Sequence, residues 1–128
     1  MSMEPTGQAP AAPRDPAARA ARLLEQLRHS RTLWSLRNAD GWVMMEERGA
    51  PGLPIWPTAA EAASSARGDW ADCAPAAIPL DEWRDRWLPG LGRDGVRIVL
   101  WPVAARAAVI VTAEEHAQHL ATALALET

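Results

Sequence analysis

In the first third of the chain, mostly apolar residues recur at steps of three and four, which is the spacing of one face of a helix. They are Ala20, Leu23, Leu24, Leu27, Arg31 and Trp34. This spacing predicts a helix that begins at Pro16. We expect it to end near Asn38-Ala39-Asp40-Gly41, because Asn, Asp and Gly favour a turn.

The apolar pattern changes at residues 41–48, which read GWVMMEER. Trp42 and Met44 would lie on one face of a strand, and Val43 and Met45 on the other. A strand that is apolar on both faces is expected in the centre of a sheet. The following GAPGLP predicts a loop. PIWP predicts a short extended piece, because the residue before a proline is disfavoured in a helix.

Two further helices are indicated by their start signals and their apolar stripes. Thr58 and Glu61 form a capping-box pattern, which predicts a helix from there to about Arg67. The second stripe consists of Leu80, Trp83, Trp87 and Leu88, and the charged residues among them would face solvent. Asp81 is placed to cap this helix and Pro89-Gly90 to end it. Both tryptophans of the stripe are therefore interpreted as core residues, in preference to a ligand site.

The last part of the chain predicts a hairpin followed by a helix. Residues 96–101 (VRIVLW) and 107–111 (AAVIV) are short β-rich runs joined by a short loop. Thr112 and Glu115 repeat the capping-box pattern before a final helix. Its apolar side is expected to contain Ala113, Ala117, Leu120, Ala121 and Leu124. The fold class predicted is α+β, a small and mainly antiparallel sheet with helices packed around it.

The length and composition indicate one domain. A chain of 128 residues can form a single core, with residues 16–128 as the domain. Residues 1–15 are rich in Pro and Ala and are predicted to be a disordered tail. No apolar run is long enough for a membrane span and no secretory signal is recognisable, so we expect a cytoplasmic protein without a membrane partner. Homodimerisation is an open alternative, because an apolar sheet face not covered by helices would need a second copy.

Charge and residue usage narrow the classes of partner. All 13 basic residues are arginine and all seven aromatic residues are tryptophan, a pattern that follows a GC-rich coding sequence. Arginine is thus weak evidence for phosphate recognition here. Residues 1–38 sum to +3 (six Arg, three acids) and residues 39–128 to −6 (seven Arg, thirteen acids). An acidic domain argues against nucleic acid as the main partner.

Few residues combine into a pattern typical of catalysis or metal binding. The single cysteine, Cys73, has no histidine near it in sequence and is interpreted as a small buried or semi-exposed residue. His116 and His119 supply only two ligands, so they are interpreted as solvated helix residues; His29 stands alone. Glu46 and Glu47 would point to opposite faces of a strand. We therefore expect no catalytic residue, no metal and no cofactor, which favours a protein that is not an enzyme and leaves an enzymatic role as the alternative.

Two functional hypotheses follow from the residues. In the first, the protein is a non-enzymatic binding protein, such as an immunity or accessory protein, and captures a basic protein partner through an acidic surface. That surface would contain Asp69, Asp72, Asp81, Glu82 and Asp85. In the second, a small-ligand or enzymatic site is formed by Trp56 and Trp70 beside the helix start at Thr58.

The order of sequence phrases resembles a known family. DGWVMM, LPIWPT, GDW, IPLDEWRDRWLPGL, RIVLWP and VIVTAEE follow one another between about residues 20 and 126. This order is similar to that of the bacterial domain of unknown function 2750, and the phrase IPLDEWRDRWLPGL is its most distinctive part. The resemblance implies a shared fold and a bacterial source, and it assigns no catalytic residue. The Pro/Ala tail and Thr58 depart from the pattern.

Overall fold

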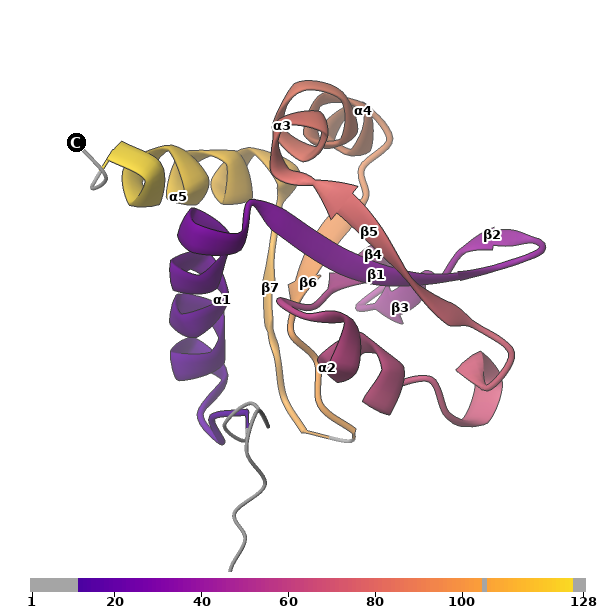
Figure 1. Cartoon of the computed structure of the whole chain (residues 1–128). Coiled ribbons are helices and arrows are strands. Elements are labelled where there is room, and N and C mark those ends of the chain that lie inside the picture. The colour runs from indigo at the N-terminus through magenta and orange to yellow at the C-terminus, as the bar shows by residue number, and fades with distance from the viewer. Residues whose placement is uncertain (1–11, 105, 126–128) are drawn as a thin grey trace, which may run out of the picture.

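The structure of the protein is a computed structural model and describes residues 12–104 and 106–125. Helices surround two β-sheets in an α+β domain, as the sequence predicted (Figure 1). In chain order the elements are α1 (Pro16–Ser30), β1 (Thr32–Asn38), β2 (Gly41–Trp42), β3 (Met45–Glu47), β4 (Ala50–Ile55), α2 (Ala59–Ser64), the 3-10 turn η1 (Gly68–Trp70), β5 (Ala74–Pro79), α3 (Leu80–Glu82), the π-helical turn η2 (Trp83–Trp87), α4 (Leu88–Arg93), β6 (Arg97–Leu100), β7 (Val109–Val111) and α5 (Ala113–Ala125).

The strands form two sheets where one was expected. The first has the order β2-β1-β5 and is antiparallel throughout; the second has the order β3-β4-β6-β7 and is parallel only between β4 and β6. The predicted hairpin is confirmed as β6 and β7. An isolated bridge joins the sheets: the N–H groups of Trp34 and Trp56 each donate to the other's carbonyl, at 2.9 and 2.8 Å.

The predicted helix from Pro16 to Asn38 is wrong in its second half. The helix ends at Ser30, because Arg31 adopts a left-handed conformation (φ 59°) and its N–H donates to the Leu27 carbonyl. Residues 32–38 instead form β1, which pairs along its length with β5. Leu33 and Ser35 are buried at the strand period of two, so sheet pairing overrides the three- and four-residue spacing.

The predicted central strand at 41–48 is also wrong. The segment divides into β2 and β3, each at the edge of a different sheet. Between them Val43 is buried, whereas Met44 is 46% exposed. The stretch GAPGLP, expected to be a loop, lies in the central strand β4. Its prolines lack donors but keep their carbonyls, and the Pro54 carbonyl accepts a hydrogen bond from the Ser35 hydroxyl at 2.7 Å.

Two of the three predicted capping residues, Thr58 and Thr112, are confirmed. The Thr58 hydroxyl accepts from the Glu61 N–H at 3.1 Å, and α2 begins at the next residue. At α5 both hydrogen bonds of the capping box are present. The Glu115 N–H donates to the Thr112 hydroxyl at 3.0 Å, and the Thr112 N–H donates to the Glu115 carboxylate at 2.9 Å. These side chains satisfy backbone donors that a helix start leaves without partners.

The tryptophan helix is longer than predicted and is not uniformly α-helical. It starts after Pro79, without a side-chain cap from Asp81, and runs past Pro89 to Arg93. Its middle is a π-helical turn, a rare conformation that often occurs at functional sites. Trp83 is fully buried, as expected, but Trp87 is only half-buried. Trp87 packs edge-on against Trp42, with ring centroids 4.8 Å apart.

The core lies between the sheets and the helices. Figure 1 shows α1 beside β7, α5 next to α1, and α2 close to β1. Leu53, Ile98 and Leu100 face this core from the second sheet. On the opposite face Val99 pairs with Ile110, and neither belongs to the main core cluster. No helix in the described part of the chain has the length and apolarity that a membrane span requires.

The predicted tail at 1–15 lies mostly outside the described residues. Of its last four residues, Ala12 packs against the core, and the carbonyls of Pro13 and Arg14 accept hydrogen bonds from Arg19. Asp15 caps α1, with its carboxylate accepting from the Ala18 N–H at 3.0 Å. Residues 12–15 therefore contact the rest of the domain.

Candidate ligand pocket

Segments that are far apart in the sequence enclose a pocket of about 360 Å³, which we call the Trp pocket. They are β3, the end of β4, the end of α2 with the turn after it, and the loop after β6. Its lining residues are Met45, Trp56, Glu61, Ser64, Ser65, Arg67, Trp70, Pro102, Val103 and Ala104. Ligand sites in proteins start at about this volume. The pocket is thus large enough for a small ligand.

The structure brings together two of the three residues expected at this site. Trp56 is fully buried, and its indole N–H donates to the Pro102 carbonyl at 3.0 Å. The Trp70 ring stands edge-on to Trp56, with centroids 6.3 Å apart and planes at 84°. Thr58 does not line the pocket, because its hydroxyl caps α2. The pocket lies along α2 from Glu61 and along the turn after it, without Thr58 itself.

Two opposite charges line the Trp pocket. The Glu61 carboxylate accepts a hydrogen bond from the Trp101 indole N–H at 3.3 Å. The Arg67 side chain donates from Nε to the Ser64 carbonyl at 3.2 Å. No ion pair joins Glu61 to Arg67 in the described residues. The two charges therefore do not neutralise each other, and the Arg67 side chain is exposed.

The loop wall of the pocket is held by a buried arginine on α1. Arg19 has 0% exposure. Its Nε donates to the Trp101 carbonyl at 3.0 Å, Nη2 donates to the Ala107 carbonyl, and Nη1 donates to carbonyls of residues 13 and 14. Trp101 and Ala104 have backbone φ angles of 52° and 45°, which residues other than glycine rarely adopt. Arg19 therefore holds this strained loop through direct hydrogen bonds, although it lies on α1, far from the loop in the sequence.

Arg19 was not among the site residues predicted from the sequence. It lies four residues before Leu23 and eight before Leu27, and these three residues are the buried ones of α1. A charged residue at a position that belongs to the apolar stripe of a helix could have indicated a buried arginine. A buried charge requires hydrogen-bond partners, and here backbone carbonyls supply them.

The five acidic residues of the predicted partner surface fall into two groups. Figure 1 shows α3 at one end of β5, with residues 68–72 in the loop at the other end. Six extended residues span about 20 Å. Asp69 and Asp72 are thus separated from Asp81, Glu82 and Asp85, and all five are exposed.

The environment of Cys73 disfavours its reactive form. Cys73 is buried, and its thiol lies 3.6 Å from the Asp72 carboxylate. Burial first, and then Asp72, raise the pKa of Cys73 above its ordinary value. Both effects disfavour the thiolate, which is the nucleophilic form.

The prediction that His116 is solvated is wrong. It is fully buried on α5, and its ring stands edge-on to Trp83 with centroids 5.8 Å apart. Burial, with a smaller effect of His119, lowers the pKa of His116 to about 4. Neither ring nitrogen has a hydrogen-bond partner among the described residues. His119 is exposed, as expected.

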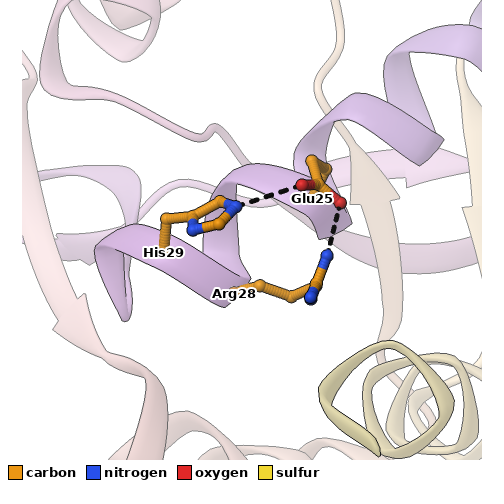
Figure 2. Close-up of polar contacts among 3 residues, drawn as sticks. All are labelled: Glu25, Arg28 and His29. Carbon is orange, nitrogen blue, oxygen red and sulfur yellow. Dashed lines mark hydrogen bonds and ion pairs between the residues drawn. The ribbon is translucent and has the colours of Figure 1, made fainter. Parts of the chain in front are cut away.

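The remaining histidine belongs to a surface cluster on α1. Figure 2 shows Glu25 between Arg28, at 2.8 Å, and His29, at 3.1 Å. His29, then Arg28, lower the pKa of Glu25. Such spacings of three and four residues are ordinary on a helix surface. In the described part of the chain no three His, Cys, Asp or Glu residues are grouped so that they could hold a metal ion.

Comparison with known proteins identifies a family and no activity. The model of the family described as "Protein of unknown function (DUF2750)" matches residues 20–120. This range includes the whole Trp pocket and α1 from Ala20 to its end, but not Arg19. No curated protein matches the chain.

Proposed function

We propose that this chain, which belongs to the DUF2750 family, is a binding protein that holds a small ligand in the Trp pocket. The single observation that carries the proposal is the composition of the pocket. The half-buried Trp70 and the fully buried Trp56 lie beside two charged groups, Glu61 and Arg67, that make no ion pair with each other. Ligand sites typically combine an apolar lining with a few oriented polar groups.

The rigidity of the pocket supports the same proposal. Trp56 is held by its indole hydrogen bond and by the two backbone bonds to Trp34. Trp101 donates its backbone N–H to the Ile55 carbonyl at 2.9 Å and its indole N–H to Glu61. A site formed before binding spends little free energy on ordering its side chains.

Benzamide is a suitable first probe, because it is neutral, planar and small. We expect saturation transfer from the protein to benzamide in ligand-observed NMR, with a Kd on the order of 1 mM. Trp70→Ala should abolish the transfer, because it removes one wall of the pocket. Trp42→Ala is the matched control, since Trp42 is also half-buried but lies outside the pocket. Equal transfer to all three proteins, or none to the wild type, would contradict the proposal.

A second candidate function is the capture of a basic protein partner, as a bacterial immunity-like protein would do in the cytoplasm. The observation in its favour is the exposure of Asp81, Glu82 and Asp85 within one short helical segment. Arg84 and Arg86 are exposed in the same segment and reduce its charge to −1, from three acids and two arginines. The attraction would therefore depend on local geometry more than on net charge.

Association kinetics test this second candidate. A basic nuclease is the appropriate partner class, and its on-rate should fall steeply between low and physiological salt. Reversal of the three carboxylates to lysine should slow association without unfolding the domain. The same change at Asp69 and Asp72, at the far end of β5, is the control and should have the smaller effect. An on-rate that ignores salt and both sets of reversals would exclude this surface.

A further inference from the structure

Beside the Trp pocket, two further cavities lie on the face of the second sheet that is opposite the main core. The nearer one, of about 220 Å³, shares Met45 and Ala104 with the Trp pocket. The farther one, of about 350 Å³, shares Arg48, Ala108 and Ile110 with the nearer one. Cavities with common lining residues are neighbours, so these two form one groove across the sheet face.

Three arginines line this groove, and we therefore call it the basic groove. Arg48 lies in the turn between β3 and β4 and lines both cavities. Arg97 begins β6 and lines the farther cavity, and Arg106 lies in the loop before β7 and lines the nearer one. Among the described residues, no side-chain hydrogen bond or ion pair engages any of the three guanidinium groups. Their charges are thus available to a partner.

Two glutamates also line the basic groove and reduce its charge. Glu115 lines the farther cavity, but its carboxylate accepts the Thr112 N–H in the capping box. Glu47 lines the nearer cavity. Three arginines and two glutamates leave a charge of +1, whereas residues 39–128 sum to −6. The groove is therefore a positive site on an acidic domain.

The backbone of Arg48 is strained. Arg48 and Gly49 form the two-residue turn between β3 and β4, with φ angles of 53° and 81°. Such a turn favours Asn, Asp or Gly at its first position, because both residues are left-handed. Arginine is poorly suited to this position, and strained residues of this kind cluster at active sites and ligand clamps.

Arg106 extends the positive charge toward the buried Arg19. Burial lowers the pKa of Arg19, and Arg106 lowers it further, while Asp15 acts in the opposite direction. The two guanidinium groups therefore repel each other. A negatively charged group beside Arg106 would reduce this repulsion.

We infer that the basic groove binds an extended acidic segment of a partner protein, with carboxylates at its arginines and apolar side chains on its sheet surface. Arg97 and Arg106 line different cavities, so a ligand that engages both must be extended. Carboxylates form strong charge-assisted hydrogen bonds with guanidinium groups. The charged residues of the Trp pocket line neither cavity, so the inference does not rest on the proposed function.

The lining of the groove favours a peptide over a nucleic acid. Basic grooves that bind single-stranded nucleic acids also offer aromatic rings on which bases stack. No aromatic residue of the described chain lines either cavity. The partly exposed apolar surface comes instead from Met45, Ala108 and Ile110. Aliphatic side chains of a peptide can bury apolar surface against these residues.

Calorimetric titration with a seven-residue peptide of alternating glutamate and leucine, blocked at both ends, tests the inference. The comparison peptide has glutamine in place of glutamate. We expect a Kd on the order of 0.1 mM for the acidic peptide, weakening as salt is added, and no measurable binding of the glutamine peptide. Arg97→Gln and Arg106→Gln should each weaken binding about threefold and together about tenfold, because exposed charge pairs are individually weak and distant ones add.

Arg48→Asn separates binding from folding. It should weaken binding of the acidic peptide about threefold, because it removes one charge. It should also raise the melting temperature, because asparagine suits the turn better than arginine. If binding and melting temperature fall together, Arg48 acts through the fold, and its assignment to the groove is overturned.

Two controls use residues outside the basic groove. Arg84→Gln combined with Arg86→Gln removes the same charge from exposed positions as the groove double variant and should bind the acidic peptide like the wild type. Trp70→Ala should also bind it like the wild type, which keeps this test separate from that of the Trp pocket.

Several outcomes would overturn the inference. They are no binding of the acidic peptide, equal binding of both peptides, and equal weakening by the groove and control double variants. Tighter binding of an oligothymidylate, weakened by the same groove variants, would assign the groove to nucleic acid instead. A dimer that Ile110→Arg dissociates would place a second copy on this face and exclude the peptide.

Discussion

Lowering the pH should destabilise the domain through His116. Its pKa is about 4 in the folded protein, whereas an unperturbed histidine has a pKa of about 6.5. The folded state therefore binds fewer protons than the unfolded state between these values, and stability falls as the pH falls. The contribution is fully present above about pH 6.5 and is lost progressively down to about pH 4. A difference of about 2.5 pKa units corresponds to about 3 kcal/mol.

The variant His116→Leu isolates this contribution from that of the carboxylates. Neither ring nitrogen has a partner in the described residues, so leucine removes no hydrogen bond there and has a suitable apolar neighbour in Trp83. Urea unfolding should be followed by tryptophan fluorescence at pH 7.5 and pH 4.5. The wild type should lose about 2.5 kcal/mol more than His116→Leu between these pH values.

His119→Gln is the matched control, because His119 is three residues along the same helix and exposed. It should retain the steep loss of stability that the wild type shows. If His116→Leu loses as much stability as the wild type on acidification, His116 is not the group responsible, and the reasoning from its burial is refuted.

Three further predictions concern packing, and all use purified full-length chain. Arg19→Met should lower the free energy of unfolding by about 3–5 kcal/mol, because several carbonyls lose a charged donor. Arg22→Met, at an exposed position, should change it by at most about 0.5 kcal/mol. Urea unfolding measures both. Trp83→Ala should cost about 3–5 kcal/mol and the half-buried Trp87→Ala clearly less; equal costs would contradict the burial argument. If the sheet face around Ile110 binds a second copy, light scattering should show a dimer that Ile110→Arg dissociates; a strictly monomeric wild type at micromolar concentration would exclude it.

Local signals in the sequence correctly predicted the starts of α2 and α5 and the β6–β7 hairpin. The capping pairs at Thr58 and Thr112 involve residues only three positions apart, and both are present in the structure. The β6–β7 hairpin likewise depends on a short connection. Such features are determined by neighbouring residues, so a single sequence is sufficient to recognise them.

Strand pairing over long distances could not be predicted in the same way. β1 is a strand because it pairs with β5, about 40 residues later, and with Trp56 through the bridge from Trp34. β4 is a central strand although it contains two prolines, because β3 and β6 pair with it on both sides. Propensity in these segments is overridden by tertiary context.

The candidate site was predicted in part for the same reason. Trp56 and Trp70 were recognised as aromatic residues near a helix, but Glu61 was assigned only to a cap and Arg67 only to a helix end. Their common position on one pocket depends on the packing of α2 against the loop after β6. His116 was misassigned because its burial depends on contact with Trp83 from another helix.

The position of Arg19 connects the stability of the domain with the shape of its pocket. Arg19 contacts none of the pocket-lining residues through a hydrogen bond, yet its bonds to the Trp101 and Ala107 carbonyls hold both ends of the loop that contains Pro102, Val103 and Ala104. The left-handed conformation of Trp101 costs on the order of 1–3 kcal/mol and persists only where surrounding contacts require it. Arg19 is one such contact, and the Trp101 indole bond to Glu61 is another. Loss of the arginine would therefore release the backbone on one side of the pocket and the Glu61 carboxylate on the other. Helix α1 thus helps to shape the Trp pocket, although it contributes no lining residue.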